Sequence, residues 1–94
     1  MKHASAASLA ELTSLLEKLR ALSPLTESKP GSFYLGSSAF LHFHEDPLGL
    51  FADLKFNGAV FERFPVNSAA EQEALLRLAK KALANSMPAA RAAR

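Results

Sequence analysis

Residues 50–64 read LFADLKFNGAVFERF, which is two runs of β-forming residues on either side of Asn57-Gly58. Asn-Gly best tolerates the positive φ angles that a two-residue type I′ hairpin turn requires. Such a turn would pair Phe56 with Ala59. Because side chains alternate along a strand, the hairpin would then have one core face and one open face. The segment therefore predicts a β-hairpin, and its short connection indicates antiparallel pairing.

Two shorter β-rich runs precede the hairpin. They occupy residues 33–35 and 39–44, and glycine, serine and proline mark the breaks around them, as is usual for turns. Residues 23–31 contain two prolines and a glycine and are predicted to form a loop. The expected sheet is an antiparallel meander of three to four strands, in which the hairpin strands are residues 50–56 and 59–64.

A helix is predicted on each side of the sheet. Ser8 and Glu11 form a capping-box pattern at the start of a series of leucines spaced three or four residues apart, which predicts an amphipathic helix over residues 9–22. Ser68 and Glu71 repeat the pattern at the start of a second helix. Two amphipathic helices beside one sheet are expected to cover the same face. The predicted fold is α+β, in the order α-β-β-β-β-α.

The length of 94 residues fits a single domain, which we assign to residues 1–86, with residues 87–94 as a frayed basic tail. The absence of cysteine excludes disulfides and thiolate chemistry. We find neither a run of about 20 apolar residues that could span a bilayer nor a signal peptide, so a cytoplasmic protein is expected. A net charge of +2 does not predict nucleic-acid binding, and the basic C-terminal residues are expected to be a solvated helix end.

The open face of the hairpin is expected to gather ionisable side chains. A two-residue turn sets Asp53 opposite Glu62, and the preceding strand directs His42 and His44 to the same side of the sheet. One register of these strands puts His42 beside Asp53. A row of His42, Asp53 and Glu62 would then cross the sheet, with His44 one step along the same face.

This row of side chains allows three interpretations. Two imidazoles and a carboxylate, from His42, His44 and Asp53, are suitable ligands for Zn²⁺ or Fe²⁺. The same groups, with Glu62 and Arg63, could bind another ligand or exchange protons. They could also be ordinary surface groups. The row itself depends on the strand register, because a bulge at Asn57-Gly58 would put Asp53 beside Arg63 and replace the row with an ion pair.

Apolar residues are also expected on the open face, namely Phe40, Phe51, Val60 and Phe64. This is more apolar surface than a monomer usually exposes, so we predict an interaction or binding module that forms a homodimer through this face. The alternative is a small enzyme or metal-binding protein that uses the histidine–carboxylate cluster. No Gly-rich phosphate loop, nucleophile elbow or HExxH motif occurs, and the sequence does not decide whether the protein is an enzyme.

The middle of the chain resembles a group of known sequences. The segments AFLHFHEDP at 39–47, GLFADL at 49–54 and FERFPV at 61–66 are similar to short conserved bacterial proteins of unassigned function. The resemblance covers residues 39–66 and implies no activity, substrate or cofactor for this chain.

Overall fold

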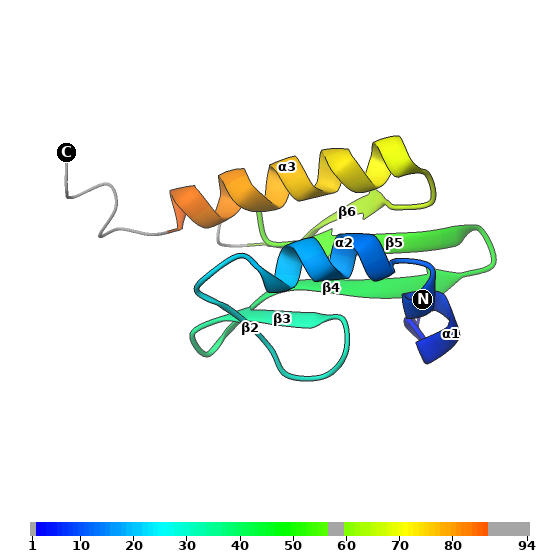
Figure 1. Ribbon diagram of the computed structural model, residues 1–94, viewed down its shortest axis with the longest axis horizontal. Helices are drawn as coiled ribbons and strands as arrows, with labels where there is room; N and C mark the ends of the chain where they lie inside the picture. Colours follow the sequence, from blue (N-terminus) through cyan, green and yellow to red (C-terminus); the bar gives the residue numbers. More distant parts are fainter. Residues whose placement is uncertain (1, 57–59, 87–94) are drawn as a thin grey trace.

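The computed structural model describes residues 2–56 and 60–86, which form an α+β fold (Figure 1). Its elements are β1 (Lys2–His3), α1 (Ala6–Ala10), α2 (Thr13–Arg20), β2 (Leu25–Glu27), β3 (Ser32–Leu35), β4 (Ser38–Asp46), β5 (Gly49–Leu54), β6 (Glu62–Pro65) and α3 (Ala69–Asn85). The predicted α+β class and the antiparallel sheet are confirmed. The predicted numbers of strands and helices are wrong, because the described residues form six strands and three helices. The Asn57-Gly58 turn and the tail at 87–94 lie outside the described residues.

The strands form one sheet in the order β2-β3-β4-β5-β6. The longest strand, β4, has 9 residues and lies at the centre. One edge of β4 pairs first with β3 and then with β1, which places His3 opposite His44. The other edge pairs with β5. The strand that carries both candidate histidines is therefore in contact with three other strands.

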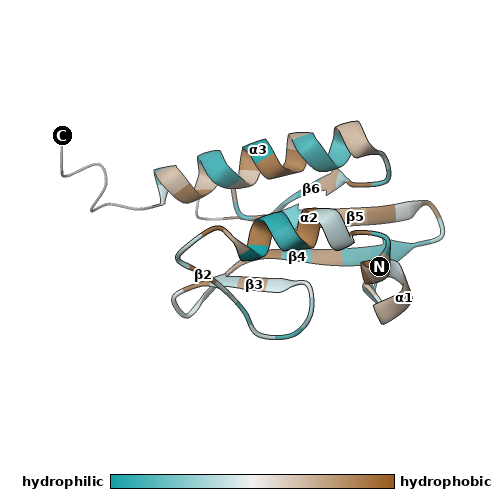
Figure 2. Ribbon diagram, in the orientation of Figure 1, coloured by the Kyte–Doolittle hydropathy of each residue, from teal (hydrophilic) through white to brown (hydrophobic). Residues whose placement is uncertain are grey.

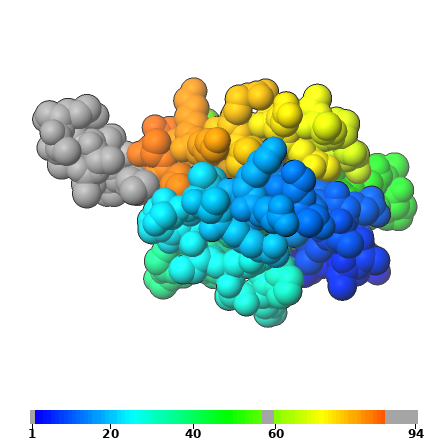
Figure 3. All heavy atoms as spheres, in the orientation of Figure 1, coloured from blue at the N-terminus to red at the C-terminus, as the bar shows by residue number. Residues whose placement is uncertain are grey.

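Helices α2 and α3 lie side by side over one face of the sheet (Figure 1). Their atoms hide most of the central strands in Figure 3, and the hydrophilic residues of β4 gather toward its C-terminal end in Figure 2. The core lies between the helices and the sheet and contains Leu12, Leu15, Leu16, Leu19, Leu41, Phe43, Ala52, Leu54, Leu75 and Leu83. No helix in the described residues has the length and apolar character needed to cross a membrane.

The N-terminal helical segment begins earlier than predicted and is interrupted. Ser5 caps α1 by accepting a hydrogen bond from the amide of Ser8, so the predicted capping box at Ser8 is wrong. The helix stops at Ala10, whose carbonyl accepts a hydrogen bond of 2.7 Å from the hydroxyl of Thr13. The predicted single helix over residues 9–22 is therefore wrong: the segment forms two helices, α1 and α2.

The second capping box is confirmed. The hydroxyl of Ser68 accepts from the amide of Glu71, and the Glu71 carboxylate accepts from the amide of Ser68. The same carboxylate also accepts from the amide of Asn67 at 2.8 Å. The start of α3 is therefore fixed by contacts that its local sequence supplies.

Strand β2 lies inside the segment that we predicted to be a loop. It has three residues and forms the edge of the sheet, with Leu25 opposite Leu35. A run of three residues next to a proline carries too little periodicity to be distinguished from a loop. Pairing with β3, rather than local preference, makes this segment a strand.

The pairing of β5 with β6 differs by one residue from the main prediction. Asp53 lies opposite Arg63, and Leu54 lies opposite Glu62. Because side chains alternate with a period of two, this shift moves every residue of β6 to the other face. Glu62 therefore leaves the face of Asp53 and Arg63 takes its place, as the bulged alternative anticipated.

Two of the four apolar residues expected on the open face are not there. Phe64 lies opposite Ala52 and packs against the core. Phe40 is 3% exposed and belongs to the core, at a point where the register of β3 and β4 shifts. The open face is therefore less apolar than the sequence indicated.

Candidate metal site

Strands β4 and β5 bring three of the candidate side chains together. His42 and His44 alternate with the core residues Leu41 and Phe43, so both histidines point away from the helix-covered side. Asp53 lies directly opposite His42 in the register of the two strands. The predicted pairing of His42 with Asp53 is confirmed.

The polar atoms of these three residues converge on one point. His44 Nε2 lies 2.9 Å from His42 Nδ1 and 3.1 Å from Asp53 Oδ2. One ligand atom from each residue lies within 4.8 Å of the other two. The rings of His42 and His44 meet edge to face, with centroids 4.9 Å apart. This group of three, His42, His44 and Asp53, is called the cluster below.

Arg63 holds the carboxylate of the cluster. Its Nε donates to Asp53 Oδ1 and its Nη2 to Asp53 Oδ2, both at 2.8 Å. Asp53 is buried, with 7% of its surface exposed. The hydrogen bonds from Arg63 lower the pKa of Asp53 in spite of burial, and the nearby histidines lower it further. Asp53 is therefore an ionised, oriented carboxylate at neutral pH.

The side chain of His42 is partly buried. Burial lowers its pKa, the proximity of His44 lowers it further, and Asp53 opposes both effects. The ring of Phe61 covers it at a centroid distance of 4.7 Å, and the ammonium of Lys55 lies 5.0 Å from the centre of that ring. At neutral pH His42 is consequently a neutral imidazole, which is the form that binds a metal ion.

His44 cannot satisfy both of its neighbours with hydrogen bonds alone. A neutral imidazole nitrogen carries either one hydrogen or one lone pair. If Nε2 of His44 carries a hydrogen, it can point at His42 or at Asp53 but not well at both. If it carries a lone pair, it faces the negative oxygen of Asp53. The other ring nitrogen, Nδ1, is buried and has no hydrogen-bond partner among the described residues.

The remaining candidates are distributed differently from the prediction. Glu62 is exposed and lies opposite Leu54, so it is not part of the cluster. Arg63, which was named as a possible partner, is the closest contact of Asp53. Sequence reasoning missed Phe61 as the cover of His42, because the predicted register put Glu62 on the open face and hence its neighbour Phe61 on the core face.

Sequence reasoning also missed His3. Its ring centroid lies 6.4 Å from that of His44, and it is exposed on a strand of two residues. Two residues carry no periodicity that could have predicted a strand. The pairing with β4 is therefore visible only in the structure.

Several surface hollows of the described residues lie elsewhere. One, of about 170 Å³, lies between α2 and α3, and another, of about 490 Å³, lies around the turn after β4. Neither these nor two further hollows, one beside Phe40 and one beside Pro47, are lined by a member of the cluster. These hollows are therefore separate from the cluster.

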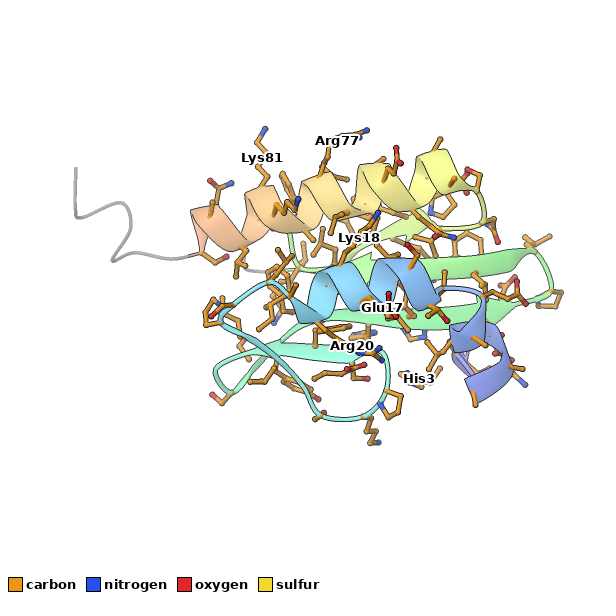
Figure 4. All side chains as sticks on the ribbon, viewed as in Figure 1. His3, Glu17, Lys18, Arg20, Arg77 and Lys81 are labelled. Carbon is orange, nitrogen blue, oxygen red and sulfur yellow. The ribbon has the colours of Figure 1, made fainter. Side chains whose placement is uncertain are left out.

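The basic residues of the helices do not form part of the site. Arg77 and Lys81 point away from the sheet on the outer side of α3, and Lys18 lies on α2 (Figure 4). Arg77 and Lys81 are exposed, as a solvated helix face requires.

Comparison of the chain with protein-family models, curated proteins and solved structures gave no match.

Proposed function

We propose that this protein is a small binding module that holds one divalent transition-metal ion, zinc or iron, on the open face of its sheet. The ligands are His42, His44 and Asp53. The observation that carries the proposal is the contact of His44 Nε2 with both other ligand atoms, at 2.9 Å and 3.1 Å.

A metal ion removes the conflict in this contact. Bonds of 2.0–2.2 Å from nitrogen or oxygen to a tetrahedral zinc ion place neighbouring ligand atoms about 3.3 Å apart. Two separations in the cluster, at 2.9 Å and 3.1 Å, are close to this value. All three ligand atoms lie within 4.8 Å of one another, so the side chains of His42 and Asp53 would move closer together around the ion. All three atoms then offer a lone pair to one positive charge, and none has to act as donor and acceptor at once.

Arg63 is compatible with this role. Its two hydrogen bonds use one lone pair on each oxygen of Asp53, and each oxygen has a second lone pair. Carboxylates that bind metals are commonly held by a hydrogen-bonding partner, which fixes their orientation. Two imidazoles and one carboxylate are a ligand set used for both zinc and non-haem iron.

The test is a calorimetric titration of the protein with ZnCl₂. The wild-type chain is expected to bind one ion per chain with micromolar or tighter affinity. His42→Gln and His44→Gln are each expected to weaken binding by more than about 10-fold, because loss of outer hydrogen-bonding partners alone costs that much. Lys55→Gln is the matched control, since it removes a neighbouring charge but no ligand, and it is expected to bind like the wild type.

Two results would contradict the proposal. One is a wild-type chain that binds neither zinc nor ferrous ion when the concentration of the metal ion is about 100 times the expected micromolar dissociation constant. The other is equal affinity in the wild type and both histidine variants, with circular dichroism showing that all are folded. Binding is favoured over turnover because the hollows found among the described residues are lined by other side chains than those of the cluster.

The homodimer and the cytoplasmic location remain predictions. Association through the open face now depends on Phe51 and Phe61, because Phe40 and Phe64 belong to the core or pack against it. Phe61 is 38% exposed. This smaller apolar area adjoins the cluster, so a second copy of the chain would cover the metal site as well.

A further inference from the structure

All three histidines of the chain lie on one part of the sheet. His3 is directly opposite His44 in the pairing of β1 with β4. Residues opposite each other in antiparallel strands direct their side chains to the same face. His3 therefore lies on the face of the cluster although it belongs to the other end of the chain.

The backbone next to His3 is held by hydrogen bonds, while the side chain of His3 is exposed. The next residue, Ala4, is buried and its amide donates to the carbonyl of Phe43 at 3.0 Å. Glu45 accepts from the amide of Ser5 at 2.7 Å. In contrast the side chain of His3 is exposed and lies apart from the helices α2 and α3, near α1 (Figure 4).

The imidazole of His3 can reach a metal ion in the cluster. Opposite residues of paired strands have Cβ atoms about 4.5–5.5 Å apart, which is less than two imidazole side chains can span together. The ring centroids of His3 and His44 are 6.4 Å apart and nearly perpendicular. Rotation of an exposed side chain about its two torsion angles changes this distance without a movement of the strand.

We propose that His3 is the fourth ligand of the metal ion, so that metal binding fastens the N-terminal strand to the sheet. This inference rests on the proposed function. Three protein ligands leave a position open for water or substrate, whereas four protein ligands close a tetrahedral site. A site of three histidines and one aspartate is closed, and its consequence is structural: the ion cross-links β1, β4 and β5.

The experiment compares the wild type with His3→Gln, and Lys2→Gln is the matched control. Lys2 is the other residue of β1 and its ammonium lies 3.4 Å from Glu45, so this control weakens the attachment of the strand without removing a ligand. Zinc affinity is measured by competition with a chromogenic chelator. Hydrogen exchange of the Ala4 amide is measured by NMR with and without zinc.

Zinc is expected to slow exchange of the Ala4 amide in the wild type and in Lys2→Gln, but not in His3→Gln. His3→Gln is expected to keep one ion per chain and to bind it at least about 10-fold more weakly, with water in the vacated position. The Co²⁺ spectrum should show this change in coordination.

If His3→Gln and the wild type have equal zinc affinity and equal protection of the Ala4 amide, His3 is not a ligand. The three-ligand site would then still hold. Absence of zinc binding in the wild type would overturn both. Loss of affinity in Lys2→Gln equal to that in His3→Gln would also overturn the inference, because strand attachment rather than ligation would then explain the effect.

Discussion

Phe40 has no partner in β3, because Phe33 pairs with Leu41 while Tyr34 pairs with Ala39. An extra residue of this kind interrupts the alternation of side chains along a strand. The ring of Phe40 is therefore buried, as is that of Phe43. From Leu41 onward the regular alternation resumes, and it directs His42 and His44 to the open face.

Replacement of Phe40 tests this assignment. Phe40→Ala is expected to lower the free energy of unfolding by about 3–5 kcal/mol, the range for a phenylalanine removed from a core. Phe61→Ala, which truncates a ring that is 38% exposed, is the matched control and is expected to cost about 1 kcal/mol or less. Urea unfolding at neutral pH measures both. Similar losses in the two variants would show that Phe40 is not a core residue.

The sequence predicts some contacts of the cluster and not others. The pairing of His42 with Asp53 follows from alternation and a short connection between two strands. The neighbour of Asp53 on β6 depended on one residue of register, which the pattern of β-forming residues does not define. His3 could not be predicted, because its position depends on the contacts of Ala4 with Phe43 and of Ser5 with Glu45, 40 residues away.

At the scale of elements, an ion pair joins α2 to the last residue of β2. Arg20 donates to both oxygens of Glu27, at 2.6 Å and 3.0 Å, and Figure 4 shows Arg20 extending from α2. The same carboxylate accepts from the amide of Gly31 at 2.8 Å. Gly31 has a φ of +82°, and a Cβ there would lie 2.8 Å from Leu9, so the loop between β2 and β3 requires glycine.

Stability should depend on pH through Glu27. The hydrogen bond from Arg20 lowers its pKa, burial opposes this, and the Gly31 amide and the charge of Arg20 lower it further. A carboxylate with a lowered folded pKa stabilises the fold above its unfolded pKa, near 4.5, and loses that contribution as the pH falls through the folded value. Glu27→Gln is expected to cost about 0.5–1 kcal/mol at pH 7, as exposed ion pairs do.

Urea unfolding of Glu27→Gln and wild type across pH 7 to pH 3 measures this dependence. The difference between the two proteins should shrink below pH 4.5. Glu73→Gln, a substitution of an exposed carboxylate on α3, is the matched control. A difference that stays constant over the whole range would show that the ion pair does not stabilise the fold.

At the scale of the whole molecule, the two faces of the sheet carry different kinds of residue. One face packs against α2 and α3 and supplies the core. The other face carries the cluster, together with Phe61, whose ring packs on His42, and Arg63, which donates hydrogen bonds to Asp53. Because the core lies on the opposite side of the sheet, substitution of His42 or His44 is expected to leave the fold intact, which makes the proposed metal binding testable.

The same separation makes self-association testable without damage to the core. If the open face forms a homodimer, sedimentation should give a mass of twice 10.1 kDa at micromolar concentration, and Phe61→Asp should shift it toward the monomer because it places a charge in an apolar contact. Leu48→Asp is the matched control, since Leu48 is 85% exposed at the opposite end of β5. A monomeric wild type, or dissociation by Leu48→Asp instead, would contradict a dimer through this face.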